Sequence, residues 1–102
     1  MPQQIVKRDG RVESWSVDRI AQAILKSLNA SGIKDPILAK RLAGKVESKL
    51  EAEAMPEQEL VQDTVEQVLM ESRLYQVARR YIVYREKRRA ILHRFAELIE
   101  ER

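Results

Sequence analysis

The chain has 102 residues, a formal net charge of +3 at pH 7 and no cysteine. This length corresponds to one domain of the commonest size. The lack of cysteine excludes disulfides, thiolate metal sites and a cysteine nucleophile or radical relay. No stretch of about eighteen apolar residues is present, and residues 1–4 lack the apolar segment of a secretion signal. We therefore expect one cytoplasmic domain.

The charge is unevenly distributed along the chain. Residues 1–35 carry six basic and four acidic side chains, residues 36–71 carry four and eight, and residues 72–102 carry nine and four. A uniformly basic nucleic-acid-binding protein would not have an acidic middle. The pattern instead predicts two basic clusters, one near each end of the chain, that converge in space.

Residues 5–13 predict a β-hairpin. An Asp9-Gly10 pair stands between two short β-prone runs, which is the strongest short-range hairpin signal. With a two-residue loop, Arg8 and Arg11 would lie directly opposite each other. Like charges across a strand pair are destabilising, so we interpret the cationic tip as an anion site, with a plain solvated surface as the alternative.

Four helices should follow the hairpin. Apolar residues between positions 17 and 28 recur at i, i+3 and i+4, with Ser16 as N-cap and Gly32 near the helix end. Asp35 and Pro36 begin a second helix, and Pro56 is expected to begin a third. The fourth helix begins near residue 74 and continues to about residue 100. The positions expected to be buried in the last two helices are Leu60, Val61, Val65, Val68, Leu69, Leu74, Val77, Ala78, Tyr81, Ile82, Ile91, Leu92, Phe95, Leu98 and Ile99.

Short loops favour antiparallel helix neighbours and hence a small bundle. An isolated hairpin is marginal in water, so the predicted hairpin must pack on that bundle, with Trp15 as its anchor. The predicted fold class is therefore α+β, mostly α, in which an N-terminal β-hairpin caps a four-helix bundle.

Candidate chemistry is restricted to binding. The three glycines are far apart, which excludes a glycine-rich phosphate loop, and the single histidine, His93, has no obvious partner. Phosphate would therefore be held by Lys and Arg side chains. Those occur in the hairpin and in residues 84–89, a run that by itself is more typical of a solvated basic face. Because Glu13 and Ser16 stand beside the hairpin cations, a nucleoside triphosphate, with its polar base and anionic tail, suits the site.

Three ordered sequence blocks resemble the ATP-cone family. Residues 5–20 contain Ile-Val-Lys-Arg-Asp-Gly followed by Glu13, Trp15 and Ser16, residues 61–69 read Val-Gln-Asp-Thr-Val-Glu-Gln-Val-Leu, and residues 78–89 contain Tyr-Ile-Val-Tyr-Arg-Glu-Lys-Arg-Arg. ATP-cones are small regulatory domains, a β-cap over a four-helix bundle, that bind ATP or dATP. They occur in ribonucleotide reductase large subunits and in a bacterial repressor of reductase genes. The resemblance covers residues 4–89.

The resemblance also implies roles for individual residues. It predicts that Lys7, Arg8, Arg19 and Lys87 bind the phosphates and that Gln62 approaches them. The adenine and ribose would be contacted by the backbone around Ile5 and by the side chains of Glu13 and Ser16. Mg²⁺ would be bound through the phosphates of the nucleotide.

The implied function is a non-catalytic, allosteric sensor of ATP or dATP. A reductase needs cysteines and the repressor has a cysteine zinc ribbon, so we expect an isolated ATP-cone over residues 1–89, either a freestanding protein or a segment of a larger one. Residues 90–102 would be an interaction segment or linker, with Phe95 and Leu98 as a candidate surface. The expected partner is a second copy or a ribonucleotide reductase catalytic domain. Two alternatives are a basic helical module that binds nucleic acid or regulates transcription, and an interaction domain whose nucleotide site has decayed.

Overall fold

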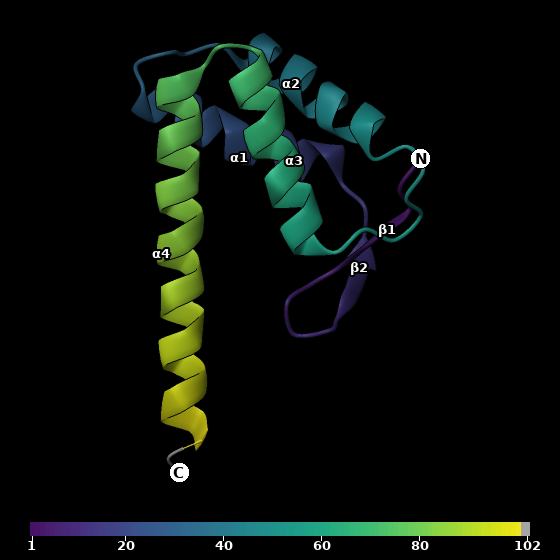
Figure 1. Ribbon diagram of the computed structural model, residues 1–102, viewed down its shortest axis with the longest axis vertical. Helices are drawn as coiled ribbons and strands as arrows, with labels where there is room; N and C mark the ends of the chain where they lie inside the picture. Colours follow the sequence, from purple (N-terminus) through teal and green to yellow (C-terminus); the bar gives the residue numbers. More distant parts are fainter. Residues whose placement is uncertain (101–102) are drawn as a thin grey trace.

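The structure is a computed structural model that describes residues 1–100, apart from the side chains of Leu92, His93 and residues 95–100. Its elements are β1 (Gln4–Val6), β2 (Val12–Ser14), α1 (Val17–Ala30), α2 (Pro36–Lys49), α3 (Gln58–Glu71) and α4 (Tyr75–Glu100). The predicted fold class is confirmed, because an antiparallel two-stranded hairpin precedes four helices (Figure 1). The segment containing Phe95 and Leu98 lies outside the described side chains.

Local sequence signals set the ends of the first two helices. The Ser16 hydroxyl accepts a hydrogen bond from the Arg19 N–H at 3.3 Å, and the Asp35 carboxylate accepts one from the Leu38 N–H at 3.0 Å. Each side chain satisfies a backbone donor that lacks a partner inside the helix. Gly32 follows α1 with φ of +82°, a conformation that glycine adopts without steric cost. These boundaries are as predicted.

Helix α3 begins later than predicted, at Gln58 and not at Pro56. The segment before it runs beside β1 in extended form: the Pro56 carbonyl accepts from the Val6 N–H at 3.0 Å, and Val6 and Glu57 form a parallel bridge. Because this backbone pairs with β1, it cannot enter the helix. The same contacts tie the hairpin to the start of α3.

The hairpin loop also differs from the prediction. The Arg11 carbonyl accepts from the Lys7 N–H at 2.7 Å, and the Gly10 N–H donates to the Lys7 carbonyl at 2.9 Å, so residues 8–10 form a three-residue loop. Gly10 has φ of +86°, as expected for a turn that ends in a left-handed residue. The predicted opposition of Arg8 and Arg11 is therefore wrong, because Lys7 lies opposite Arg11.

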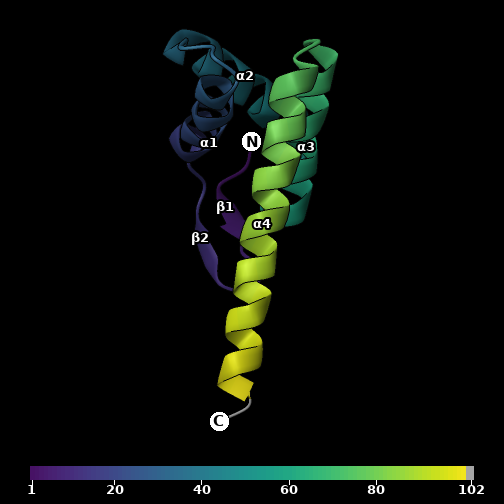
Figure 2. The same cartoon turned by 90° about the vertical axis from the view of Figure 1, so that its left-hand side faces the viewer.

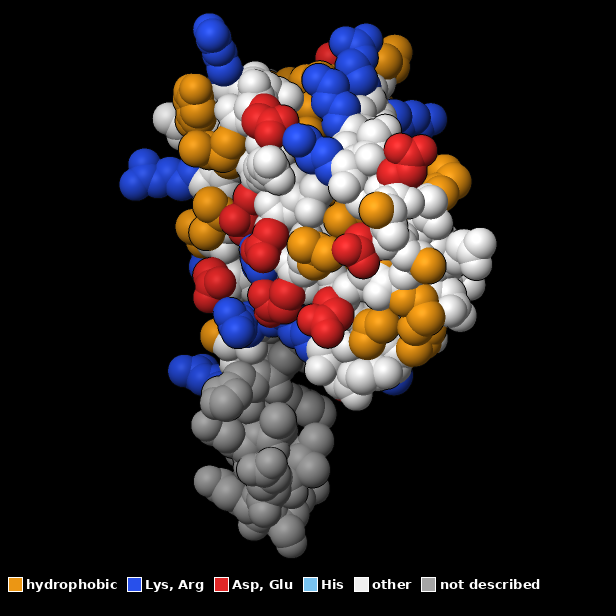
Figure 3. Space-filling model, turned by 45° about the vertical axis from the view of Figure 1, so that its right-hand side comes forward, with side chains coloured by type: hydrophobic (Ala, Val, Ile, Leu, Met, Phe, Trp, Pro, Cys, Tyr) orange, Lys and Arg blue, Asp and Glu red, His pale blue; other side chains and the backbone are white. Residues whose placement is uncertain are grey.

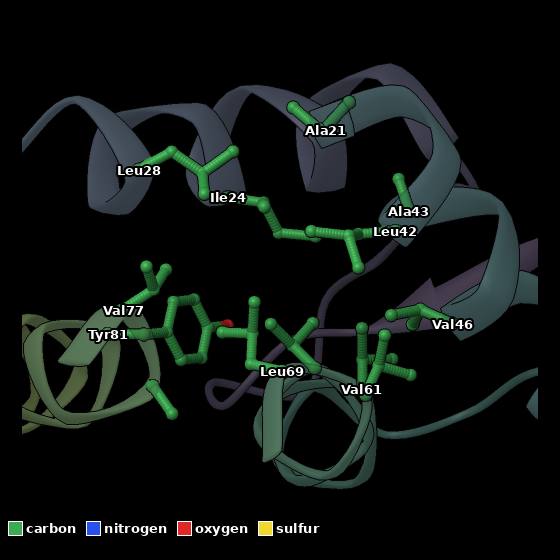
Figure 4. Close-up of a cluster of buried hydrophobic side chains, with 14 of the residues drawn as sticks. Ala21, Ile24, Leu28, Leu42, Ala43, Val46, Val61, Leu69, Val77 and Tyr81 are labelled. Atoms are coloured by element: carbon green, nitrogen blue, oxygen red, sulfur yellow. The ribbon is translucent and has the colours of Figure 1, made fainter. Parts of the chain in front are cut away.

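The four helices pack in a ring, in which α1 contacts α2, α2 contacts α3, α3 contacts α4 and α4 contacts α1. Figure 1 shows α3 and α4 side by side in opposite directions, with α1 and α2 crossing them steeply. The largest fully buried side chains lie between the helices (Figure 4) and include Ile24, Leu28, Leu42, Val46 and Leu69. Each large apolar side chain contributes about 1.5–3 kcal/mol when fully buried.

The hairpin packs on this core through Ile5 and Trp15. The indole Nε1 of Trp15 donates to the Glu47 carboxylate on α2 at 2.8 Å. Trp15 therefore anchors the hairpin to the bundle, as predicted, and its hydrogen bond to Glu47 joins the end of the hairpin to α2.

Three side chains that we expected to be buried are exposed. Leu60 and Ile82 are each 40% exposed and Ile91 is 67% exposed. Leu60 and Ile82 are next to the buried Val61 and Tyr81, and one residue turns the side chain by about 100° around a helix. Ile91 lies in the second half of α4, and the C-terminal part of that helix projects beyond the other helices (Figures 1 and 2). Within residues 1–100, no helix has both the length and the apolar character needed to cross a bilayer.

Candidate functional site

A cavity of about 160 Å³ opens where the hairpin meets the starts of α1 and α3 and the side of α4. Its apolar lining residues are Ile5, Trp15, Ile20, Ala23, Val61 and Val65. Its polar lining residues include Lys7, Glu13, Ser16, Arg19, Gln62 and Tyr81. The cavity therefore joins an apolar wall to a charged edge formed by residues far apart in sequence.

Most of the predicted site residues meet at this cavity. Six of the eight line it: Ile5, Lys7, Glu13, Ser16, Arg19 and Gln62. Arg8 reaches the same place from the hairpin loop, because its Nη2 donates to Gln62 Oε1 at 2.9 Å. Lys87 lies elsewhere, in a second hollow of about 400 Å³ that is also lined by Arg79, Arg80 and Tyr84.

The Glu13 carboxylate lies among the cations at the edge of the cavity. Its Oε2 lies 3.1 Å from Arg19 Nη1 and 3.8 Å from Lys7 Nζ, while its Oε1 lies 3.9 Å from Arg11 Nη1. Such partly exposed ion pairs contribute about 0–1 kcal/mol each. An incoming phosphate can therefore replace Glu13 at low cost. The like charges that face each other at the tip are Lys7 and Arg11, not Arg8 and Arg11 as predicted, and each of them has a carboxylate partner.

Arg8 is held by helix α3. Besides its hydrogen bond to Gln62, its Nη2 lies 3.3 Å from Glu59 Oε1. Its Nε is buried and has no hydrogen-bond partner among the described residues, and an unsatisfied buried donor costs about 1–3 kcal/mol. Arg8 thus retains unused donor capacity beside the cavity.

Arg11, which also lies near Glu13, makes its shortest contacts within its own turn. Its backbone N–H donates to Asp9 Oδ1 at 3.0 Å and its Nε donates to Asp9 Oδ2 at 2.6 Å. The backbone hydrogen bond, followed by the side-chain contact, holds the pKa of Asp9 below its ordinary value. The pair closes the hairpin loop.

A cluster of ion pairs around the buried Arg85, which we did not predict, lies next to Arg8. The Arg85 side chain on α4 is only 8% exposed and donates to Asp63 at 2.8 Å, Glu66 at 2.6 Å and Glu59 at 2.7 Å. Burial alone would lower the pKa of Arg85, but the three carboxylates outweigh it and raise the pKa above the ordinary value.

The sequence contains a signal for this cluster. The three carboxylates are spaced i, i+4 and i+7, which places them on one face of α3. Figure 3 shows acidic side chains gathered on the surface there, with basic ones between them. Spacing alone does not identify the cation that they surround.

Comparison with known proteins identifies the family. The sequence model of the family described as the ATP cone domain matches residues 3–90 of the chain. The chain is 42% identical over 99 residues to the vitamin B12-dependent ribonucleoside-diphosphate reductase of Thermoplasma acidophilum, covering 89% of the chain and 12% of that protein. It is 34% identical over 82 residues to the anaerobic ribonucleoside-triphosphate reductase of Salmonella typhimurium, covering 80% of the chain and 12% of that protein. The chain therefore belongs to the ATP-cone family, the regulatory nucleotide-binding domains of ribonucleotide reductases.

Proposed function

We propose that this chain is a non-catalytic, allosteric sensor that binds ATP or dATP, with Mg²⁺ on the phosphates. The observation that supports it is a single cavity with an apolar wall and three flanking cations, Lys7, Arg8 and Arg19. The cavity, at about 160 Å³, is smaller than the roughly 300–1,000 Å³ of sites that enclose a whole ligand. It suits the base, while the phosphates remain at the charged edge.

The ion pairs at the edge suggest how the triphosphate is accommodated. Lys7 and Arg19 exchange Glu13 for phosphate oxygens, and charge-assisted hydrogen bonds to phosphate are among the stronger ones. Glu13 and Ser16 then become available to the ribose and base. Gln62 acts mainly by holding Arg8 in position, since its Oε1 already accepts from Arg8 at 2.9 Å.

Lys87 is included in the proposal because of the family resemblance. Its exposed side chain lies in the second hollow, and a lysine has a flexible four-carbon stem that can redirect its ammonium group. We propose that Lys87 turns toward the phosphates only when a nucleotide is bound.

The regulated partner is proposed to be the catalytic part of a ribonucleotide reductase or a second copy of this chain. A nucleotide can shift an assembly only through different affinities for its two states. Size-exclusion chromatography of the chain with a reductase catalytic domain, with ATP, with dATP and without nucleotide, tests this directly. An elution profile that neither nucleotide alters would contradict it.

Isothermal titration calorimetry with ATP and dATP in the presence of Mg²⁺ tests nucleotide binding itself. We expect saturable heat from at least one of them, and weaker binding for Lys7→Ala and Arg19→Ala. Lys45→Ala is the matched control, because Lys45 is exposed on α2 and does not line the cavity. Folded protein that gives no heat with either nucleotide would contradict the proposed function.

A second candidate function, nucleic-acid binding, is favoured by the larger hollow. It presents Arg79, Arg80 and Lys87 beside the half-exposed Tyr84, and none of these three cations has an ion-pair partner among residues 1–91. Single-stranded nucleic acids bind to basic grooves with stacking aromatics. This function predicts oligonucleotide affinity that falls steeply with salt and is indifferent to free ATP.

A further inference from the structure

The side chain of Tyr81 forms part of the wall of the cavity. It is only 6% exposed, yet it lines the cavity together with Ile20, Ala23, Val61 and Val65 from α1 and α3. Figure 4 shows its ring reaching from α4 into the space between these helices, with the oxygen directed inward. The charged edge with Lys7, Glu13 and Arg19 belongs to the hairpin and the start of α1.

The Tyr81 hydroxyl has no hydrogen-bond partner among the described residues. In that part of the chain, the fully buried side-chain nitrogen or oxygen atoms without a partner are Arg8 Nε and Arg85 Nε. The hydroxyl is therefore not sealed inside the core, and the cavity that Tyr81 lines gives it access. It is a polar atom presented to a space whose nearby walls are apolar.

Packing alone does not account for a tyrosine here. Phenylalanine would fill the same space without a polar atom, so the hydroxyl adds nothing to the packing. A polar group that faces a cavity pairs there with ordered water or with a ligand. Burial raises the pKa of Tyr81 to about 12, so the group is a neutral donor at physiological pH.

We infer that the Tyr81 hydroxyl is a specificity-determining group that donates a hydrogen bond to a ring nitrogen of the bound nucleobase. The inference rests on the proposed nucleotide function and adds the group that reads the base. In this arrangement the base lies against the apolar wall with one ring nitrogen at Tyr81. The ribose and phosphates extend toward Glu13, Lys7 and Arg19.

Calorimetry of Tyr81→Phe with ATP, ADP and AMP tests the inference. A neutral hydrogen bond contributes about 0.5–1.5 kcal/mol, so we expect affinity to fall about two- to twelvefold. Because the lost contact is to the base, the factor should be the same for all three ligands. For Lys7→Ala the loss should instead grow with the number of phosphates. The variant should be at least as stable as the wild type, because it loses an unpartnered hydroxyl.

Analogues of ATP that lack one ring nitrogen identify the accepting atom. We compare 1-deaza-, 3-deaza- and 7-deaza-ATP. The analogue that lacks the accepting nitrogen should bind the wild type about as weakly as ATP binds Tyr81→Phe. The Tyr81→Phe variant should bind this analogue and ATP with equal affinity. This pair of changes forms a double-mutant cycle between protein and ligand.

The outcomes separate the two proposals. A wild-type protein that binds no nucleotide contradicts the proposed function itself. Wild-type binding of ATP that Tyr81→Phe does not weaken overturns the role of Tyr81 alone. The role is also overturned if the affinity lost through Tyr81→Phe depends on the number of phosphates of the ligand. It is overturned as well if each of the three deaza analogues loses the same affinity, relative to ATP, on the variant as on the wild type.

Discussion

Arg8 of the hairpin loop and Glu59 of α3 form an ion pair, with Arg8 Nη2 3.3 Å from Glu59 Oε1. The other oxygen of the same carboxylate, Oε2, accepts a hydrogen bond from Arg85 on α4 at 2.7 Å. One carboxylate thus links the hairpin, α3 and α4. Because Arg8 is a proposed phosphate-binding residue, Glu59 competes with the nucleotide for the Arg8 guanidinium.

The substitution Glu59→Gln should therefore tighten ATP binding. The amide keeps the size of the side chain but removes the negative charge beside the phosphate site. A partly exposed pair of this kind contributes about 0.2–1 kcal/mol, which corresponds to a gain in affinity of about one and a half- to fivefold. Calorimetry with ATP measures it. Glu71→Gln is the control, because Glu71 lies at the far end of α3 and pairs with Lys49 at 3.1 Å. Weaker binding by Glu59→Gln would contradict competition and indicate that Glu59 holds Arg8 in place.

Arg85 should be important for stability. Replacing it with methionine leaves the carboxylates of Glu59, Asp63 and Glu66 close together without their cation. Removing one partner of a buried ion pair costs about 3–5 kcal/mol, and since these carboxylates are partly exposed we expect the free energy of unfolding to fall by about 2–3 kcal/mol. Urea denaturation measures it. Arg79→Met, at an exposed position of the same helix, should change stability by less than about 0.5 kcal/mol; an equal loss in both variants would contradict the role of the cluster.

Local signals made much of the fold predictable. Ser16, Asp35 and Gly32 determine helix ends through their own side chains or backbone freedom, and the apolar spacing identified the buried faces. The start of α3 was not predictable in this way, because it depends on backbone pairing between Val6 and Pro56. Contacts of that kind join residues distant in sequence, and periodicity within one element does not reveal them.

The candidate site shows the same division. The charged residues of the hairpin could be predicted, because they follow each other in a recognisable block. Tyr81 was predicted as a core residue from its spacing, and nothing in that spacing distinguishes a sealed hydroxyl from one that faces a cavity. Arg85 looked like one more exposed cation of a basic helix, since its three partners lie on another element.

Trp15 should report nucleotide binding by fluorescence. It is the only tryptophan of the chain, it lines the cavity, and its indole N–H donates to Glu47 at 2.8 Å. A base in the cavity changes the surroundings of the ring, so its emission should change on titration with ATP and saturate at the concentration found by calorimetry. Inorganic phosphate, which binds only at the charged edge, should leave the emission unchanged. The same response to both ligands would contradict a base in the cavity.

Lys87 should matter for the triphosphate and not for the base. We expect Lys87→Ala to weaken ATP binding by about ten- to hundredfold, the value of one charge-assisted hydrogen bond, and to leave AMP binding unchanged. Arg94→Ala is the matched control, because Arg94 is an exposed cation further along α4. Calorimetry compares the four combinations. Equal, small effects of the two variants on ATP would remove Lys87 from the phosphate site and leave it to the second hollow.

Tyr81 should also make stability dependent on alkaline pH. Burial raises its pKa from the ordinary 10.0 to about 12, so below pH 10 both the folded and the unfolded chain keep the proton. As the pH rises toward 12 the unfolded chain releases it first, and the free energy of unfolding should fall by about 2–3 kcal/mol. Urea denaturation from about pH 9 to about pH 12 measures this loss. In Tyr81→Phe this contribution is missing, so its free energy of unfolding should fall by about 2–3 kcal/mol less than that of the wild type between about pH 9 and about pH 12. Tyr75→Phe, at an exposed position of α4, should behave as the wild type. Identical pH profiles for wild type and Tyr81→Phe would show that the hydroxyl is solvated in the folded protein.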